Sequence, residues 1–448
     1  MDFPVCLPHD YMAWLFDQSE ELYSLRVRGG LSDAKLQEFW DGVPREDVVW
    51  QHGFDPNDME MVSPIVTHSD GVPVTKDAAK FSMFTMSINP CLGMGTPLDR
   101  GWLYTMVPDE AIVSRLDNTA GNATCDRLYK TYMWSLEACH DGRHPYDDAD
   151  GNEYPSDHPR SIIAGDPLVD HNRLAHLRTT GDMENFEKEF GVRNHGAEEL
   201  CSKCRANRST LPWNDFRDGA LFKTSLFTPM DWPVHHPWLE WPAKDPQNIA
   251  WDWAHTMDKG ITMNCIGGVF AELVIESTLH PGGTQAQQVA QLNADVQTYY
   301  EENKSTDRIH EIKKCMFLPV SVFSDTPTFN PGNMSKVRTL VGFVKEYTQH
   351  HCEEDSIRDA HRREAASLLF DMYEFVMCGP LVFSEDESSD LKKTTDDFLQ
   401  HYTALGNIAY EELKLCYGTV PKCHALWHIV NDNLFNPRLF GAFKVKTL

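Results

Sequence analysis

The stretch Phe81-Ser-Met-Phe-Thr-Met-Ser-Ile88 determines how the middle of the chain folds. Its residues alternate between two sets of side chains, and a period of two is typical of a β-strand whose two faces are both partly apolar. The run Trp102–Val107 lies between a glycine and a proline and predicts a second short strand. An earlier strand through Val62–Val66 completes the set. We expect Met61–Pro108 to form three antiparallel strands, with Asp70 at the C-terminal end of the first.

Helical patterns lie on both sides of this strand-rich region. Residues 1–60 show helical spacing of apolar residues, and the pattern from residue 283 to the end is helical as well. Between them, 161–165 and 174–180 resemble strands, Met183–Phe190 resembles a helix, and 205–250 resembles a long ordered loop. The sequence therefore predicts an α/β fold with an N-terminal helical segment (1–60), a core (61–280) and an all-helical C-terminal part (281–448).

Composition excludes several classes of protein. The 448 residues include 67 acidic and 40 basic side chains, a net charge of -27, which argues against nonspecific coating of nucleic acid. No apolar run approaches the roughly 18 residues of a membrane span. The first residues carry acids and no basic segment, so we expect no secretory signal. The 12 cysteines are too few for a disulfide scaffold and favour an intracellular protein with free thiols.

The clearest local motif is Cys201-Ser-Lys-Cys204. Two thiolates at this spacing can hold one tetrahedral metal ion such as zinc, but they are only half of a site. Candidates for the other half are His195, the pair His235–His236, and the Asp252–His255 segment. Two alternatives remain, namely buried thiols without a metal and a redox pair. No thioredoxin-like pattern surrounds the motif, which disfavours the redox pair.

Two aspartates lie where predicted strands end. Asp70 precedes Gly71, and Asp182 lies between the strand expected at 174–180 and the helix expected at Met183–Phe190. Carboxylates at neighbouring strand ends can hold two Mg²⁺ ions for phosphodiester chemistry. The ordinary interpretation is that an Asp-Gly pair after a strand forms a turn.

The order of the motifs resembles the DDE-type transposases of the CACTA (En/Spm-like) group. The resemblance spans most of the chain and consists of short motifs: PHDYMAWLF and LQEFWDGV near the start, HSDGVPV at 68–74, GWLYTMVP, TTGDMENFEKEFGV at 179–192, LCSKCRAN with PWNDF at 200–216, WDWAHTMDKGITMNCIGGVFAEL at 251–273, and VPKCHALWHIV with NPR at 420–438.

This resemblance implies a fold, a set of site residues and a function. The fold is an RNase H-like core, interrupted by a helical insertion and carrying a CxxC zinc element. Asp70 and Asp182 would be catalytic carboxylates that bind Mg²⁺ or Mn²⁺, with Asp166 as a rival for the second. Cys201, Cys204, Asp252 and His255 would form the structural zinc element. The implied partner is DNA, which is cleaved and transferred in the nucleus.

The family's third acidic residue is expected after the Asn436-Pro-Arg438 segment, where this sequence has no acid beyond Asp432. Asp432 is therefore our candidate for the third catalytic carboxylate, with Glu364 and Asp371 as alternatives. Because two-metal chemistry needs all its carboxylates, we expect weak or absent DNA cleavage. The alternative functions are a transposon-derived, non-catalytic interaction module stabilised by zinc, or an unrelated acidic α/β protein.

Overall fold

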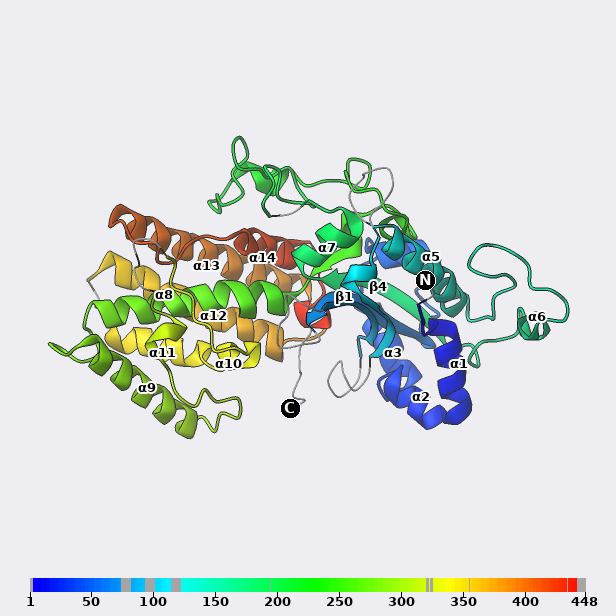
Figure 1. Ribbon diagram of the computed structural model, residues 1–448, viewed down its shortest axis with the longest axis horizontal. Helices are drawn as coiled ribbons and strands as arrows, with labels where there is room; N and C mark the ends of the chain where they lie inside the picture. The colour runs from blue at the N-terminus through cyan, green and yellow to red at the C-terminus, as the bar shows by residue number, and fades with distance from the viewer. Residues whose placement is uncertain are drawn as a thin grey trace. The chain divides into compact units, whose positions relative to one another are not determined.

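The computed structural model describes residues 3–73, 82–92, 101–113, 122–193, 195–319, 322, 325–353, 355–432 and 434–440. Figure 1 shows the chain from blue at its N-terminus to red at its C-terminus. The chain forms two compact units. The first comprises Met1–Thr210, Ser225–Asp252 and Asn433–Leu448, and the second comprises Leu211–Thr224 and Trp253–Asp432. The boundaries predicted near residues 60 and 280 stay predictions. Within the described residues, no helix has the length and apolar character that a membrane span requires.

A five-stranded mixed sheet forms the centre of the first unit, in the order β3-β2-β1-β4-β5. The strands are β1 (Val62–Pro73), β2 (Ser82–Pro90), β3 (Trp102–Pro108), β4 (Arg173–Gly181) and β5 (Ile249–Trp251). β2 runs antiparallel to both β1 and β3, whereas β4 is parallel to β1, and β5 is parallel to β4. The predicted α/β class and the three-stranded antiparallel meander are confirmed.

One detail of the meander prediction was wrong. Asp70 does not end β1, because the strand continues to Pro73 and Asp70 lies opposite Thr85 of β2. The Asp70-Gly71 pair resembles a turn, but pairing with β2 keeps both residues extended. The strand predicted at 161–165 was also wrong, since Pro159–Ile163 forms the short helix α6, which begins at a proline and is capped by the His158 side chain. The strand at 174–180 and the helix α7 (Met183–Phe190) are confirmed.

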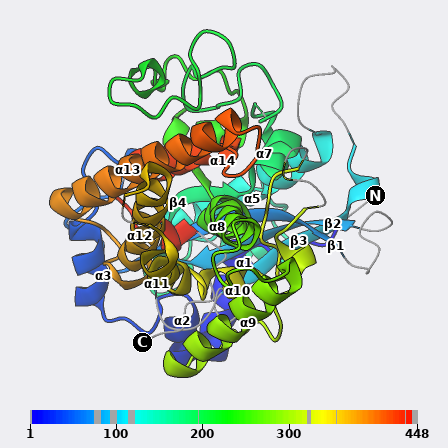
Figure 2. The same ribbon diagram turned by 90° about the vertical axis from the view of Figure 1, so that its left-hand side faces the viewer.

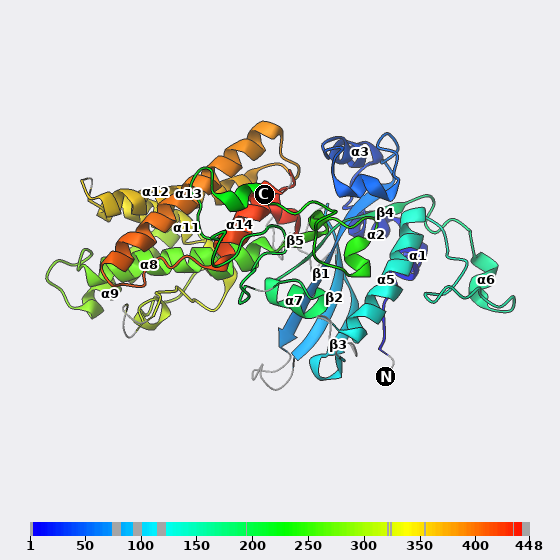
Figure 3. The ribbon, with the colours of Figure 1, turned by 90° about the horizontal axis from the view of Figure 1, so that it is seen from above.

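Helices α5 (Ala123–Asp141) and α7 lie beside the sheet, as Figure 3 shows from above. Tyr132 of α5 shares a 2.8 Å hydrogen bond with Thr67 of β1, and Asn185 of α7 donates to Ser69. Thr67 and Ser69 point to the same face because strand residues two apart share a face. Residues 8–41 form three N-terminal helices: α1 (Pro8–Gln18), α2 (Glu20–Arg26) and α3 (Asp33–Asp41). From 205 to 250 the structure holds only β5 and the short 3₁₀ turns η3 (Leu221–Thr224), η4 (Pro237–Glu240) and η5 (Pro246–Asn248).

The second unit is helical in the residues that the structure describes. It starts with the π-helix η6 (Ala254–Ile261) and continues with α8 (Thr262–Ile275), α9 (Gln285–Glu302), α10 (Met334–Arg338), α11 (Val341–His351), α12 (Ile357–Cys378), α13 (Glu385–Glu411) and α14 (Pro421–Asn431). Figure 2 shows α8, α11, α12 and α13 gathered together. A buried ion pair of 2.7 Å between Arg362 of α12 and Glu272 of α8 links two of these helices.

Candidate metal centre and carboxylate edge

Four buried side chains form a group that could hold one metal ion. Cys201, Cys204, His424 and His428 each offer one ligand atom, and these atoms all lie within 4.8 Å of one another. A tetrahedral zinc ion would hold sulfur and nitrogen ligands about 3.3–3.8 Å apart, given bond lengths of about 2.0–2.3 Å. The four atoms are therefore grouped closely enough to be ligands of one ion.

The two cysteines lie in a loop that already donates hydrogen bonds to their sulfurs. The backbone N–H of Lys203 lies 3.3 Å from the Sγ of Cys201, and the N–H of Ala206 lies 3.4 Å from the Sγ of Cys204. Amides directed at sulfur stabilise a thiolate, which is the form that binds a metal. The loop is fixed in turn by Trp232, whose indole N–H donates to the carbonyl of Ser202 at 2.7 Å. All twelve cysteines are free, so no disulfide competes for these thiols.

The two histidines lie one turn apart on α14, and their partners determine their tautomers. The Nδ1 of His424 lies 3.0 Å from the carbonyl oxygen of Trp213, and the Nδ1 of His428 lies 3.0 Å from a carboxylate oxygen of Asp432. Both oxygens can only accept, so each neutral ring carries its proton on Nδ1. Each Nε2 then has a lone pair for a metal. A carboxylate or carbonyl behind a ligating histidine is the usual arrangement around protein-bound zinc.

The charge of this group also suits a buried ion. Two thiolates and two neutral imidazoles carry a charge of −2, which a Zn²⁺ ion would balance. The group is therefore a Cys₂His₂ set that could bind zinc. The sequence predicted its two cysteines and missed its two histidines, although His424-x₃-His428 has the spacing of zinc-binding histidines.

The other predicted ligands lie outside this group. His255 is in η6, where its Nε2 lies 3.5 Å from the ammonium of Lys259. Asp252 is buried and extends the β5 ladder through its N–H to Gly181. His236 contacts Asp126 at 3.0 Å, whereas His195 and His235 are exposed.

The two predicted catalytic aspartates lie toward the C-terminal ends of the parallel strands β1 and β4, at the carboxylate edge. The last pair of the β1–β4 ladder is His68 with Thr180, and each aspartate comes two residues after that pair. Asp70 is still within β1, whereas Asp182 follows the end of β4 at Gly181. Asp252 follows β5, one strand further along. Asp70 and Asp182 are half-buried, so both remain accessible.

The rivals and alternatives to these aspartates lie elsewhere. Asp166 is exposed in the turn after α6 and belongs to no strand. Asp432 holds the ring of His428, and Asp371 pairs with Lys345 at 3.1 Å. Glu364 lies on the exposed side of α12. Among the described residues, only the Cys/His group brings three or more ligand atoms within 4.8 Å, so the aspartates share an edge without forming a closed ion site.

Asp182 also begins helix α7, because its carboxylate accepts the N–H of Asn185 at 2.7 Å. Further along α7, Glu189 is completely buried and accepts hydrogen bonds from Asn185 and from the Tyr129 hydroxyl. Burial raises the pKa of Glu189 to about 8, so this side chain is mostly neutral at pH 7.

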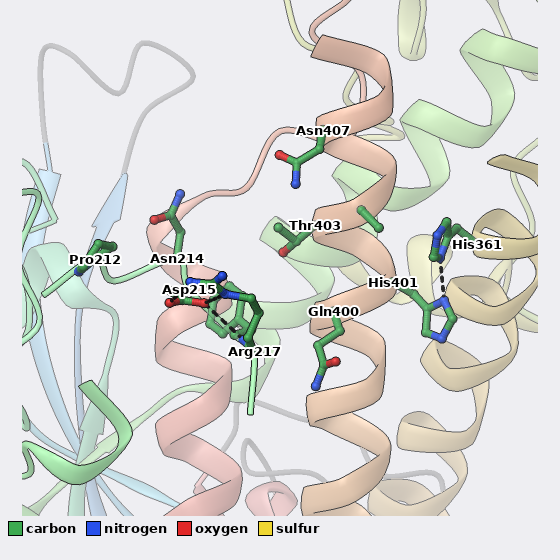
Figure 4. A pocket seen from close by; sticks show the side chains of 11 residues that line it. Pro212, Asn214, Asp215, Arg217, His361, Gln400, His401, Thr403 and Asn407 are labelled. Atoms are coloured by element: carbon green, nitrogen blue, oxygen red, sulfur yellow. Dashed lines mark hydrogen bonds and ion pairs between the residues drawn. The ribbon is translucent and has the colours of Figure 1, made fainter. Parts of the chain in front are cut away.

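The second unit contains a cavity of about 660 Å³ beside α13. Figure 4 shows Asn214, Thr403 and Asn407 along it, together with His361 and His401, whose Nδ1 atoms are 2.8 Å apart. Its one carboxylate, Asp215, is paired with Arg217 at 2.7 Å. The lining carries no excess of acidic side chains, and we assign no chemistry to it.

No protein-family model matches the chain, and no curated protein matches it either.

Proposed function

We propose that the protein is a DDE-type, transposase-like enzyme that cleaves and transfers DNA strands with divalent metal ions. Asp70 and Asp182 would be its metal-binding carboxylates, on a core of the RNase H-like type. The observation that supports this most strongly is the parallel register of β1 and β4, since Asp70 and Asp182 each come two residues after the last pair of that ladder. The resemblance in motif order had selected the same two residues.

The topology of the first unit also supports the proposal. The order β3-β2-β1-β4-β5, with α5 between β3 and β4 in the chain and with β4 and β5 parallel to β1, supports an RNase H-like core. The second unit, which comprises Leu211–Thr224 and Trp253–Asp432, interrupts the first within the sequence. An interruption by helices is what the resemblance implies for this family.

The chemistry explains why paired carboxylates matter. Bound Mg²⁺ or Mn²⁺ ions would activate a water or a 3′-hydroxyl and stabilise the leaving oxygen of the phosphodiester. The two aspartates would hold these ions at the carboxylate edge, where Asp70 belongs to β1 and Asp182 begins α7. Such a site needs further carboxylates. Asp252 lies in the same row, whereas Asp432 already supports His428.

The Cys/His group would have a structural role in this protein. Four protein ligands fill the coordination sphere of zinc and leave no position for water or substrate, whereas catalytic zinc sites keep one open. We therefore propose structural zinc at Cys201, Cys204, His424 and His428.

The test is nicking of labelled duplex DNA with Mn²⁺ at low salt. Low salt is needed because the net charge of -27 opposes duplex capture. We expect slow nicking that falls at least about 100-fold in Asp70→Ala and in Asp182→Asn, since each removes a metal ligand. Asp166→Asn, an exposed aspartate outside the sheet, is the matched control and should keep the wild-type rate. Asp252→Asn tests whether Asp252, which follows β5, is a further metal ligand.

A second candidate function is a non-catalytic interaction module stabilised by zinc, which the Cys/His group favours. The same assay separates the two. Absence of nicking in the wild type, with one zinc per chain, would favour the module. Nicking that survives in Asp70→Ala would contradict the enzyme assignment.

A further inference from the structure

A buried polar cluster lies beneath the carboxylate edge of the first unit. It consists of Ser69 on β1, Tyr129 on α5, and Asn185 and Glu189 on α7, all of them buried. The amide of Asn185 donates one hydrogen bond to the Ser69 hydroxyl at 2.9 Å and the other to Glu189. Tyr129 donates to the second carboxyl oxygen of Glu189. The cluster therefore links β1, α5 and α7: Asn185 bonds to β1, and Glu189 joins Asn185 to α5.

The cluster lies next to both proposed metal ligands. Ser69 directly precedes Asp70 in β1, so the contact with Asn185 fixes the strand at that point. Asn185 also gives its backbone N–H to the Asp182 carboxylate at 2.7 Å. Asn185 thus contacts both Ser69, next to Asp70, and Asp182 itself. Glu189 holds the side-chain amide of Asn185 in place.

A simple packing role does not require this chemistry. A buried carboxyl group is costly, and an apolar side chain of the same size would fill the space at lower cost. Burial keeps Glu189 mostly neutral at pH 7, with its pKa raised to about 8, which lowers the cost without removing it. Supporting groups behind metal ligands typically account for 10–100-fold in metal affinity or activity.

We propose that Glu189 is a positioning residue, which orients Asn185 and thereby aligns Asp70 and Asp182 for metal binding. The proposal rests on the proposed function, because it takes the two aspartates as metal ligands. Glu189 itself touches neither aspartate through a hydrogen bond and would bind no ion.

The experiment measures Mn²⁺ affinity by the electron paramagnetic resonance of free Mn²⁺, with Asp70→Ala as the blank for binding at the edge. We expect Glu189→Ala to weaken this affinity about tenfold or more, and Glu189→Gln to stay within about threefold of wild type, because glutamine keeps the oxygen that Asn185 needs. Glu184→Gln, an exposed glutamate on the same helix, is the matched control and should change nothing. Tyr129→Phe is a milder second variant in case Glu189→Ala folds poorly, and zinc content reports the fold.

Wild-type Mn²⁺ affinity in both Glu189→Ala and Tyr129→Phe would overturn the proposal, as would an equal loss of Mn²⁺ affinity in Glu184→Gln.

If wild type and Asp70→Ala bind Mn²⁺ alike, the proposed function has failed. Hydrogen exchange of the peptides around 66–73 and 182–190 then decides whether Glu189 aligns the edge. The proposal expects faster exchange in both peptides for Glu189→Ala and in neither for Glu184→Gln. Unchanged exchange at 66–73 would overturn it independently of metal.

Discussion

At the scale of single residues, Asp432 supports His428 of the Cys/His group, a role that its position in the sequence did not suggest. Its carboxylate accepts the Nδ1 proton of His428 at 3.0 Å and so keeps Nε2 available for a metal. We expect Asp432→Ala to retain zinc about tenfold less tightly in competition with a chelator, while Asp432→Asn keeps an acceptor and loses less. Asp390→Ala, on the exposed face of α13, is the control and should match wild type. Equal retention in all variants would remove Asp432 from the site.

His52 is expected to make the folded protein less stable in acid. Burial, the neighbouring His140 and Arg178 lower its pKa to about 3, so the folded protein holds it neutral. The unfolded chain takes up a proton near pH 6.5, so stability is complete above that pH and falls as the pH drops below it. One such histidine costs up to about 1.4 kcal/mol per pH unit. Urea unfolding at pH 7 and 5 should show a smaller loss for His52→Gln than for wild type or the exposed control His235→Gln.

Glu189 in helix α7 is expected to change the stability with pH in the direction opposite to His52. The folded pKa of Glu189 is raised to about 8, above its ordinary value near 4.5. Its contribution to stability is therefore complete below pH 4.5 and is lost as the pH rises through 8. We expect Glu189→Gln to unfold with a flatter pH dependence between pH 5 and 8.5 than wild type, measured by denaturant titration. Glu184→Gln should keep the wild-type slope, and a wild-type slope in Glu189→Gln would mean that Glu189 is charged in the fold.

Local patterns predicted elements where short-range signals agreed. Alternation identified β2, and an N-terminal aspartate before an amphipathic run identified α7. The prediction failed at Asp70-Gly71, where the turn signal is local but the β1–β2 ladder is not. It also failed at 161–165, since a five-residue apolar run fits a strand or a helical turn equally well.

Whole-molecule features depend on contacts that no short pattern encodes. The CxxC motif predicted half of the metal group, but pairing it with His424 and His428 required knowing which distant segment returns to it. The resemblance implied Asp252 and His255 as the remaining ligands, but a short motif does not determine which distant segment returns to the CxxC in a chain whose first unit is interrupted by the second. The parallel pairing of β1 with β4, near whose ends Asp70 and Asp182 lie, depends on such distant contacts too.

Loss of zinc is expected to destabilise the molecule as a whole. A structural zinc ion contributes about 10–16 kcal/mol in small zinc-binding peptides, as much as the total stability of a typical domain. The ligands here come from segments far apart in the sequence, so one ion would restrict the unfolded chain over a long loop. We expect one zinc per chain in wild type, none in Cys204→Ser, and a melting temperature lower by at least about 10 °C. Cys378→Ser, an exposed cysteine, should keep both values. Equal zinc in wild type and Cys204→Ser, or none in either, would refute the site. Zinc loss without a lower melting temperature would instead show that the ion is bound by a fold that does not depend on it.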